Sequence, residues 1–356
     1  MDAVRVGAVS TGAVSTGAVN TGVVIAVDGG GSKTDAVAVA LDGRVLAHSR
    51  GAASNPQTEG LAAALAVVDA LVTEVSAAAG HPLSGVGVFL AGLDLEAEVT
   101  TFREAAAQLP WSRVGTPIYD NDMHALLRTG TDQADAVAVV CGTGINCIGV
   151  RADGATARFP ALGLLSGDWG GGTQIGEQAM WFAARAVDGR GAPTVMSVTI
   201  PAHFGLTDMQ AVIEAFHFGR LPYSALATLS PVVFGAADAG DAVAASIVER
   251  QAGEIVELAR AAISRLDLDD TALPVVLGGG VLAAGNAHLL GRIETGLAEV
   301  APLARISLVR DRPIVGAALL TLEAAGANTE HLEAARAALA STFARLDEQR
   351  LDDEQR

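Results

Sequence analysis

Short β-branched apolar runs and longer amphipathic segments follow one another in a regular order along this chain of 356 residues. The short runs predict strands, and segments with an apolar residue at every third or fourth position predict helices. In the first part of the chain the predicted strands are 23–28, 35–41, 44–48, 85–90 and 114–119, and the predicted helices are 57–79, 95–108 and a short one from 122. This βββαβαβ order is typical of an α/β fold.

The second part of the chain begins like the first. Its predicted strands are 135–141, 145–150, 156–160, 274–278 and 305–309, and its predicted helices fill most of 173–265 and then 285–299, 313–325 and 329–346. In each part an apolar strand ends in a glycine-rich turn with a hydroxyl residue, and another strand follows. This repetition predicts an internal duplication with a cleft between the two halves.

The first 22 residues do not share these patterns. Residues 7–22 repeat a five-residue unit, Gly-Ala-Val-Ser-Thr or Gly-Ala-Val-Asn-Thr, three times. Three such copies cannot build a solenoid, and Gly, Ser and Thr bury too little apolar area to offset the entropy of the chain. We expect residues 1–22 to form a flexible low-complexity leader without a functional role.

Composition narrows the class of partner. The formal net charge is −17, so the field of the whole protein repels nucleic acids and anionic lipids. A nucleotide can still bind, because local donors and Mg²⁺ outweigh a diffuse field that salt screens. We expect no stretch to approach the roughly 20 apolar residues of a membrane span, and the N-terminus lacks a signal-peptide pattern. These features predict a cytoplasmic protein with no nucleic-acid and no membrane partner.

The most informative motif contains the only lysine of the chain. A buried strand that ends at Asp28 is predicted to enter a tight hairpin made of Gly29, Gly30, Gly31, Ser32, Lys33 and Thr34. Glycine lets backbone N–H groups approach a phosphate closely, and hydroxyl and ammonium groups add donors. Asp28 is placed to orient a hydrated Mg²⁺. The alternative interpretation is a glycine hairpin with a solvent-facing lysine.

Three further motifs follow along the chain. They are Tyr119-Asp120-Asn121-Asp122, then Cys141-Gly142-Thr143-Gly144-Ile145-Asn146-Cys147, and finally Gly278-Gly279-Gly280-Val281. Asp122 lies at a predicted strand end and helix start, where the positive end of the helix keeps an acid ionised. An N-cap is the alternative role for this residue. The pattern of a P-loop kinase does not occur in the sequence.

In this order the four motifs resemble those of the actin, Hsp70 and sugar-kinase superfamily. Within it the chain is most similar to the BadF/BadG/BcrA/BcrD-type ATPase family and, among these, to the N-acetylglucosamine kinases. The resemblance covers about 23–326, and its most specific parts are VDGGGSKT, CGTGINC and the segment from Gly163 to Gly172. It implies a two-domain actin-like ATPase fold, a duplicated ribonuclease H-like α/β fold with an interdomain cleft. We expect the domains at 23–120 and 121–326, with a helix at 327–350 able to pack back on the first.

The resemblance also implies roles in ATP binding and catalysis. Asp122 would be the general base, with Asp120 as its nearest rival, and Asp28 would be the metal residue. The phosphates of ATP would bind to the two hairpins, Gly29-Gly30-Gly31-Ser32-Lys33-Thr34 and Gly142-Thr143-Gly144, and the adenosine to the turn Gly278-Gly279-Gly280. Mg²⁺ would accompany the ATP.

For the sugar, the resemblance points to Asn55, Asn146 and Asp168, whose amides and carboxylate suit a polyol. From the residues alone, Asn55-Pro56 also fits a turn before a helix, and Asn146 fits a bulge. Trp169 departs from the family pattern, in which an acidic residue is usual after the Gly-Asp pair. Its indole would either stack on a sugar face or pack under the glycine turn.

The implied activity is transfer of the γ-phosphoryl group of ATP to the 6-hydroxyl of N-acetyl-D-glucosamine. The alternatives are a kinase for another amino sugar (glucosamine, N-acetylmannosamine, N-acetylmuramate) or for glucose, a BadF-like activator ATPase with an iron–sulfur cluster, and a non-catalytic sugar sensor. Cys141 and Cys147 flank the second hairpin, and we expect them to be small core residues, although two cysteines per chain could form a four-thiolate cluster across a dimer. The preferred sugar and the oligomeric state, including a homodimer, stay open.

Overall fold

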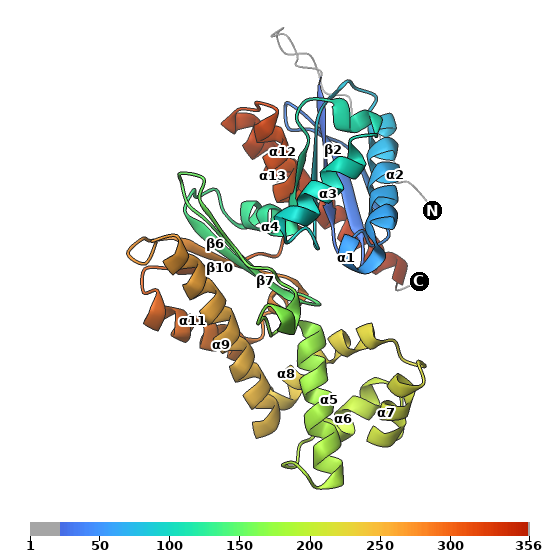
Figure 1. The fold of residues 1–356 in the computed structure, drawn as a ribbon, viewed down its shortest axis with the longest axis vertical. Helices are drawn as coiled ribbons and strands as arrows, with labels where there is room; N and C mark the ends of the chain where they lie inside the picture. Colours follow the sequence, from blue (N-terminus) through green and yellow to red (C-terminus); the bar gives the residue numbers. More distant parts are fainter. Residues whose placement is uncertain (1–21, 355–356) are drawn as a thin grey trace. The chain divides into compact units, whose positions relative to one another are not determined.

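The computed structural model describes residues 22–354 (Figure 1), so the expected leader lies outside the described residues except for Gly22. The chain forms two compact units. The first combines the residues up to Asp132 with those from Asp311 onward, and the second is Gln133–Arg310. The predicted α/β class is confirmed, since each unit contains one five-stranded sheet flanked by helices.

The sheet of the first unit has the strand order β3-β2-β1-β4-β5. Its strands are β1 (Val23–Gly29), β2 (Thr34–Ala40), β3 (Val45–Gly51), β4 (Leu83–Leu90) and β5 (Ile118–Asn121). The first three form an antiparallel meander, and the turn at Asp42-Gly43 closes its second hairpin as predicted. Because β4 runs parallel to β1 and to β5, the carboxyl ends of these three strands meet at one edge of the sheet.

Helices cover both faces of this sheet (Figure 1). They are α1 (Pro56–Glu59), α2 (Leu61–Ala79), α3 (Glu96–Ala106), α4 (Asp122–Gly130), α12 (Ile314–Ala324) and α13 (Thr329–Glu354), with a 3₁₀ turn at Pro110–Arg113. Side chains alternate along β1, so Val23, Ile25 and Val27 pack in the core with α2 and α3. Val24 and Ala26 face the opposite core, which contains α12 and α13. The strand is therefore apolar at every position from Val23 to Val27, because both of its faces are covered.

Helix α2 corrects two expectations. The predicted helix 57–79 is interrupted at Gly60, whose φ of +82° separates α1 from α2. The 19 residues of α2 have a mean hydropathy of 1.8, so by length and composition α2 could cross a membrane, and the expectation that no stretch approaches this length was wrong. Among the described residues a bent pair of helices, Tyr223–Asp238 with Ala242–Arg265, passes the same test. A core helix of a soluble protein can also meet this criterion of length and composition. Helix α2 buries one apolar side, which includes Val68 and Val72, in the core with β1 and β4.

The sheet of the second unit has the order β10-β9-β6-β7-β8. Its strands are β6 (Ala136–Cys141), β7 (Ile145–Val150), β8 (Thr156–Arg158), β9 (Pro274–Gly278) and β10 (Arg305–Leu308). Again three strands form an antiparallel meander, and two more run parallel to its first strand. This order repeats that of the first sheet, as the predicted duplication requires.

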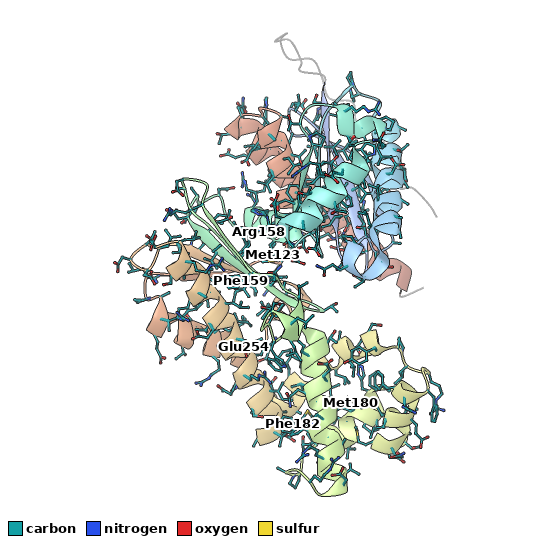
Figure 2. The ribbon with its side chains drawn as sticks, in the orientation of Figure 1. Met123, Arg158, Phe159, Met180, Phe182 and Glu254 are labelled. Carbon is teal, nitrogen blue, oxygen red and sulfur yellow. The ribbon has the colours of Figure 1, made fainter. Side chains whose placement is uncertain are left out.

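Between β8 and β9 the second unit is almost entirely helical. Its helices are α5 (Gly172–Asp188), α6 (Met196–His203), α7 (Met209–His217), α8 (Ser230–Asp238) and α9 (Ala242–Arg265), followed by α10 (Gly280–Ala283) and α11 (Ala287–Val300), with 3₁₀ turns at Gly163–Leu165 and Tyr223–Leu229. Figure 2 labels Met180 and Phe182 on α5, where both pack against the hydrophobic core of this unit.

The two units do not have the bounds that we expected for the domains. Residues 121–132 and 311–326 belong to the first unit, because α4 packs against α12. The two helices approach so closely that a Cβ on Gly316 would lie 1.9 Å from the carbonyl oxygen of Ala125. The Thr129 hydroxyl accepts a hydrogen bond from the Gly316 N–H at 2.9 Å.

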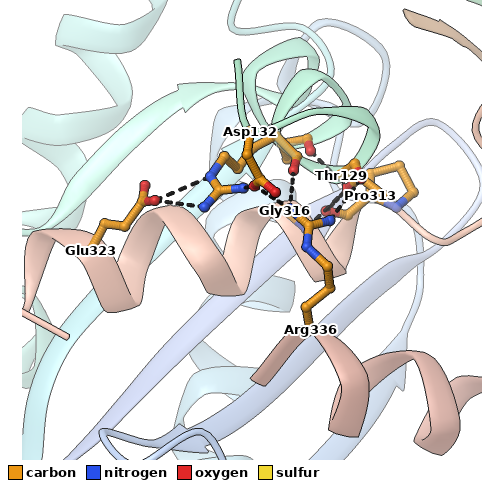
Figure 3. A network of polar contacts seen from close by, with 8 residues as sticks. Thr129, Asp132, Pro313, Gly316, Glu323 and Arg336 are labelled. Atoms are coloured by element: carbon orange, nitrogen blue, oxygen red, sulfur yellow. Dashed lines mark hydrogen bonds and ion pairs between the residues drawn. The ribbon is translucent and has the colours of Figure 1, made fainter. Parts of the chain in front are cut away.

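Helix α13 holds the end of α4 in place. The Arg336 guanidinium donates to the carbonyl oxygen of Thr129 at 2.9 Å and to the Asp132 carboxylate at 2.6 Å (Figure 3). Arg128 in turn donates to Glu323 of α12 at 2.7 Å. This part of the C-terminal region packs back on the first unit.

We predict that Gly316→Ala destabilises the first unit, because its methyl group would overlap the backbone of α4. The free energy of unfolding should fall by about 1–3 kcal/mol in denaturant titrations. Gly253→Ala on α9 is the control, since a Cβ there meets nothing within 4 Å. In a helix interior that change should raise the free energy of unfolding by about 0.5–1 kcal/mol. Equal stability of the two variants would contradict the close packing of α4 and α12.

Candidate functional site

The predicted hairpin between β1 and β2 is present and presents its backbone to solvent. The Gly30 N–H donates to the carbonyl oxygen of Lys33 at 3.0 Å, which closes the turn. Gly31, Ser32 and Lys33 are exposed, and their N–H groups form no hydrogen bond with any other described residue. A Cβ at Gly30 or Gly31 would meet nothing within 4 Å. The hairpin is therefore an open turn with free donors, as an anion site requires.

Thr34 does not share this exposure. Its side chain is fully buried, and its hydroxyl lies 2.6 Å from the carbonyl oxygen of Ala52 and 2.7 Å from the Ser54 hydroxyl. The Ser54 N–H donates to the carbonyl oxygen of Gly30 at 3.1 Å. The Thr34 hydroxyl therefore fastens the segment after β3 to the hairpin, and of the two hydroxyl side chains expected at the phosphate site only that of Ser32 is exposed.

Behind the hairpin lies a buried charge network around Asp35. Arg50 donates two hydrogen bonds to its carboxylate at 2.8 and 2.9 Å, and His48 lies 2.9 Å from it. Burial opposes ionisation, but the hydrogen bonds of His48 and Arg50 lower the pKa of Asp35 to about 2. Desolvation and then repulsion by Arg50 lower the pKa of Lys33. The same network reaches α13, because Arg312 lies 3.9 Å from Asp35 and contacts Asp347.

Acidic side chains gather at the carboxyl edge of the first sheet. Asp28 is the penultimate residue of β1, Asp94 follows β4, and Asp122 follows β5. Burial, followed by repulsion from Asp122, raises the pKa of Asp28 well above its usual value. Burial and then the charge of Asp94 raise the pKa of Asp122 to about 7, although the N–H groups at the start of α4 oppose the shift. An acid with a pKa near neutrality at such an edge is a candidate for proton transfer.

The N-cap of α4 is Asn121 rather than Asp122. Its side-chain oxygen accepts a hydrogen bond from the Met123 N–H at 3.0 Å, and its amide group donates to Asp94 at 3.0 Å. The capping role is thereby filled by a neighbour, and Asp122 is the first residue of the helix. Asp120 accepts a hydrogen bond from the Asn121 N–H at 2.8 Å and lies 3.4 Å from His124.

Asn55 caps the short helix α1 in the same unit. Its side-chain oxygen accepts a hydrogen bond from the Gln57 N–H at 2.8 Å, as the turn interpretation required. That oxygen would lie only 2.2 Å from a Cβ on Gly92, so the loop after β4 lies directly against Asn55. The amide nitrogen of Asn55 has no partner among the described residues.

The second predicted hairpin lies between β6 and β7 of the second unit. The Gly142 N–H donates to the carbonyl oxygen of Gly144 at 3.0 Å, and Thr143 is exposed at the tip. The first turn of α5 lies against this hairpin, because the Gly172 N–H donates to the carbonyl oxygen of Gly142 at 2.8 Å. A Cβ on Gly171 would lie 2.4 Å from the Cα of Gly144, so the two backbones touch.

Asp168 lies just before α5 in the same unit and is buried. The Ser166 hydroxyl donates to its carboxylate. Gln174 fixes the turn that follows, since its amide nitrogen donates to the carbonyl oxygen of Asp168 at 2.8 Å and its oxygen accepts from the Gly170 N–H at 2.9 Å. Gln251 of α9 donates to the carbonyl oxygen of Gly170 at 3.0 Å. One turn thus carries Asp168 and leads into the helix that touches the second hairpin.

Sequence reasoning missed the three residues that support Asp168 and its turn, Ser166, Gln174 and Gln251. Gln251 is fully buried within the apolar stripe of α9, and its side-chain oxygen has no partner among the described residues. A glutamine on such a stripe was a visible signal, because buried polar groups need partners. Gln174 and Ser166 carry no comparable pattern, since polar residues in a glycine-rich loop are common.

The remaining candidates in the second unit have mainly internal contacts. Trp169 is buried, and Arg250 lies 3.9 Å from the centre of its ring, so the indole packs in the core. The Asn146 side chain accepts a hydrogen bond from the Cys147 N–H at 2.7 Å. Gly279 has a φ of +87°, and a Cβ there would lie 2.4 Å from the carbonyl oxygen of Cys141. The turn at Gly278–Gly280 is therefore beside the strand that leads into the second hairpin.

Both cysteines are buried core residues, as expected. Burial raises the pKa of the Cys141 thiol to about 12 and that of Cys147 further. Among the described residues, no group of three or more His, Cys, Asp or Glu side chains could hold a metal ion. A metal bound here would need ligands from another molecule in addition to one or two carboxylates.

Comparison with known proteins gives a consistent result. The sequence model of the BadF/BadG/BcrA/BcrD ATPase family matches residues 25–321. An N-acetyl-D-glucosamine kinase of Dictyostelium discoideum is 27% identical over 313 residues, which cover 84% of this chain and 98% of that relative. An N-acetylmuramic acid/N-acetylglucosamine kinase of Clostridium acetobutylicum is 28% identical over 262 residues, or 73% of this chain and 85% of that relative.

Solved structures extend the likeness to the fold. A protein of Chromobacterium violaceum described as a proposed N-acetylglucosamine kinase is 25% identical, with a TM-score of 0.63, and the match covers 84% of this chain and 98% of that one. A ROK family glucokinase of Streptomyces griseus, solved with glucose and AMPPNP, has a TM-score of 0.51 at 18% identity and covers 85% of this chain and 99% of its own. The second likeness concerns the fold alone. The predicted actin-like sugar-kinase fold is confirmed.

We predict opposite behaviour for two hydroxyl residues of the first hairpin. Thr34→Val removes a buried hydroxyl and leaves the Ala52 carbonyl without its donor, so the free energy of unfolding should fall by about 1–3 kcal/mol. Ser32→Ala changes an exposed side chain and should leave that free energy within about 0.5 kcal/mol. Thermal and denaturant unfolding of both variants measure the difference. A destabilised Ser32→Ala together with a stable Thr34→Val would reverse the assignment.

Proposed function

Since this chain belongs to the BadF/BadG/BcrA/BcrD ATPase family, we propose that it is an ATP-dependent kinase that phosphorylates the 6-hydroxyl of N-acetyl-D-glucosamine. The observation that carries the proposal is the acid edge of the first sheet, where Asp122 has a pKa of about 7. Both curated relatives are named as kinases of N-acetylglucosamine, which supports this sugar as the substrate. A cytoplasmic location, where ATP is plentiful, is part of the same proposal.

The two glycine hairpins are proposed to bind the phosphates of ATP. Gly31, Ser32 and Lys33 of the first hairpin offer free N–H groups, and Lys33 adds a positive charge. The Gly142–Gly144 hairpin offers a second exposed turn with the Thr143 hydroxyl. Phosphoryl transfer depends on positioning and on charge stabilisation, so donors of this kind are what the reaction needs. We assign the adenosine to the turn at Gly278–Gly280.

Asp28 is the residue proposed to hold Mg²⁺. Its pKa is raised by burial and by the charge of Asp122, so a cation beside it would relieve an unfavourable interaction. Mg²⁺ prefers oxygen ligands and is commonly held by one or two carboxylates, its waters and the substrate phosphates. When bound, the ion would neutralise charge on the phosphates. The single carboxylate of Asp28 fits this manner of binding.

Asp122 is proposed to act as the general base. A carboxylate that accepts the proton of the attacking hydroxyl must be deprotonated at neutral pH yet basic enough to take a proton, and a pKa near 7 meets both conditions. Asn121 caps the helix, which leaves the Asp122 carboxylate available for chemistry. Asp120 is less suited because it already bonds the Asn121 N–H and lies beside His124.

The residues proposed to bind the sugar are Asn55, Asn146 and Asp168. Asn55 of the first unit has a free amide nitrogen, and Asp168 of the second unit has a carboxylate held by Ser166. Asn146 of the second unit completes the proposed set. Amide and carboxylate groups form the paired hydrogen bonds through which a site discriminates among polyols.

The activator-ATPase alternative has less support. An iron–sulfur cluster needs accessible thiolates, whereas Cys141 and Cys147 are buried and their thiol pKa values are raised. Another amino sugar, or glucose, stays the main alternative substrate, because small changes in loops around C2 and C3 decide that preference.

We predict N-acetylglucosamine-stimulated release of ADP in a coupled assay across a panel of free sugars. Asp122→Asn should lower kcat by roughly 10²–10⁴ with a much smaller change in sugar affinity, because it removes the base and keeps the shape. For the unaltered protein, kcat/KM should fall about tenfold per pH unit below pH 7, where Asp122 becomes protonated.

Two variants control this prediction. Asp120→Asn should retain most of the activity. Asp94→Asn removes a like charge near Asp122, so the fall of kcat/KM on the acid side of the pH profile should move to lower pH. Near-normal kcat in Asp122→Asn would refute the base assignment. Steady ADP release that no sugar stimulates would favour an activator ATPase instead.

We also predict that Asp168→Ala weakens the binding of the sugar much more than the binding of Mg²⁺·ATP. Loss of a charged hydrogen-bond partner should weaken sugar binding by about 1.5–3 kcal/mol, roughly 10- to 150-fold, and leave Mg²⁺·ATP affinity within about threefold. Asn146→Ala should act in the same direction but less. Calorimetric titration of each variant with sugar and with Mg²⁺·ATP gives the comparison. If Asp168→Ala loses Mg²⁺·ATP and keeps the sugar, the residue serves the metal.

A further inference from the structure

A small pocket opens beside Asn55 in the first unit. It has a volume of about 250 Å³ and lies between α1, the start of α2 and α3. Of the residues that line it, Pro56 follows Asn55 in the chain, and Gly92 lies directly against the Asn55 side chain. The pocket is therefore continuous with the residue assigned to the sugar.

A chain of hydrogen bonds connects this pocket with the proposed base. Asn121, the residue before Asp122, donates to one oxygen of Asp94 at 3.0 Å. Gln57, which lines the pocket, donates to the other oxygen of Asp94 at 3.1 Å. The pocket residue Gln57 and the neighbour of Asp122 thus bond different oxygens of the same carboxylate. In a hexopyranose whose 6-hydroxyl meets Asp122, C2 is the ring carbon opposite C5, which carries that hydroxymethyl group, and C3 is next to C2.

The side-chain donors that line the pocket already donate hydrogen bonds to other groups of the protein. The amide nitrogen of Gln57 donates to Asp94 and, at 2.9 Å, to Glu98. The hydroxyl of Thr101 donates to the carbonyl oxygen of Ala97 at 2.7 Å. Apart from Glu98, the other lining side chains are apolar or glycine, and no Lys, Arg or His lines the pocket. A chemical group bound in this pocket would therefore contact hydrogen-bond acceptors and apolar surface rather than side-chain donors.

Glu98 supplies a fixed negative charge in this pocket. Its carboxylate accepts from the N–H groups of Asp94 and Leu95 at 2.9 and 2.8 Å, so it caps the amino end of α3. The positive end of the helix is thereby matched by a charge of the protein itself. An anionic guest would compete with Glu98 for the same N–H groups and would be repelled by it.

Resting on the proposed function, we propose that this pocket receives the C2 or C3 substituent of the sugar and selects neutral groups over carboxylates. A neutral acetamido or hydroxyl group can donate to Glu98 and place its carbon atoms against Pro56 and Ala97. A 3-O-lactyl carboxylate would face Glu98 with no side-chain donor to pair with it. The enzyme is therefore a kinase of neutral amino sugars that discriminates against sugar acids, although one relative is named for both kinds.

The test compares three sugars with Mg²⁺·ATP. They are N-acetylglucosamine, N-acetylmuramic acid and the carboxamide of N-acetylmuramic acid, which has the size of the acid without its charge. The kcat/KM of the acid should be about 10- to 100-fold below that of its carboxamide, because like charges in a partly desolvated pocket repel strongly. Glu98→Gln, which keeps a capping-box residue at this position, should reduce that ratio to less than about threefold.

Glu96→Gln is the matched control. Glu96 lies in the same first turn of α3 but is exposed and does not line the pocket, so the ratio of carboxamide to acid should stay unchanged. Equal kcat/KM for acid and carboxamide would overturn the inference, as would a ratio that Glu98→Gln leaves intact. If N-acetylglucosamine is phosphorylated but neither 3-O-substituted sugar is, steric exclusion replaces charge selection and the inference fails. If N-acetylglucosamine itself is not phosphorylated, the proposed function fails.

Discussion

Parallel pairing of β4 with both β1 and β5 is the constraint on which the rest of the first unit depends. It brings three carboxyl strand ends to one edge, and with them Asp28, Asp94 and Asp122. Burial raises the pKa of Asp28 and of Asp122 at this edge, and the charges of Asp122 and Asp94, respectively, add to the two shifts. The fold thereby creates a basic carboxylate and an attractive position for a cation from ordinary aspartates. Neutral amides at Asn121 and Gln57 keep Asp94 in place without removing its charge.

The sequence predicted the strands, the main helices and both glycine hairpins, because apolar periodicity and glycine turns are local signals. It could not place the unit boundary. The packing of α4 on α12 depends on the missing side chain of Gly316, nearly 190 positions away from Thr129 in the chain. Nor could it show that the Thr34 hydroxyl turns inward while Ser32 stays outside, since nothing local in the sequence separates a hydroxyl residue in the turn from one at the start of β2.

The second unit relies on side-chain amides where the first relies on carboxylates. Gln174 and Gln251 together bond both sides of the turn at Gly170, and that turn carries Asp168 into the start of α5. A neutral amide can donate and accept at once, so it can brace a bent backbone without adding charge beside an anionic ligand. These contacts join residues up to 81 positions apart and left no periodic trace in the sequence.

The C-terminal segment that Arg312 and Asp347 connect to Asp35 affects how the protein folds during translation. The second unit is one continuous stretch, whereas one face of the first sheet is covered by α12 and α13, which follow that unit in the chain. During translation the ribosome therefore releases a complete second unit while the apolar face of β1 and β2 is still bare. That apolar face stays uncovered until α12 and α13 emerge, so the first sheet completes its packing only after the second unit has been synthesised.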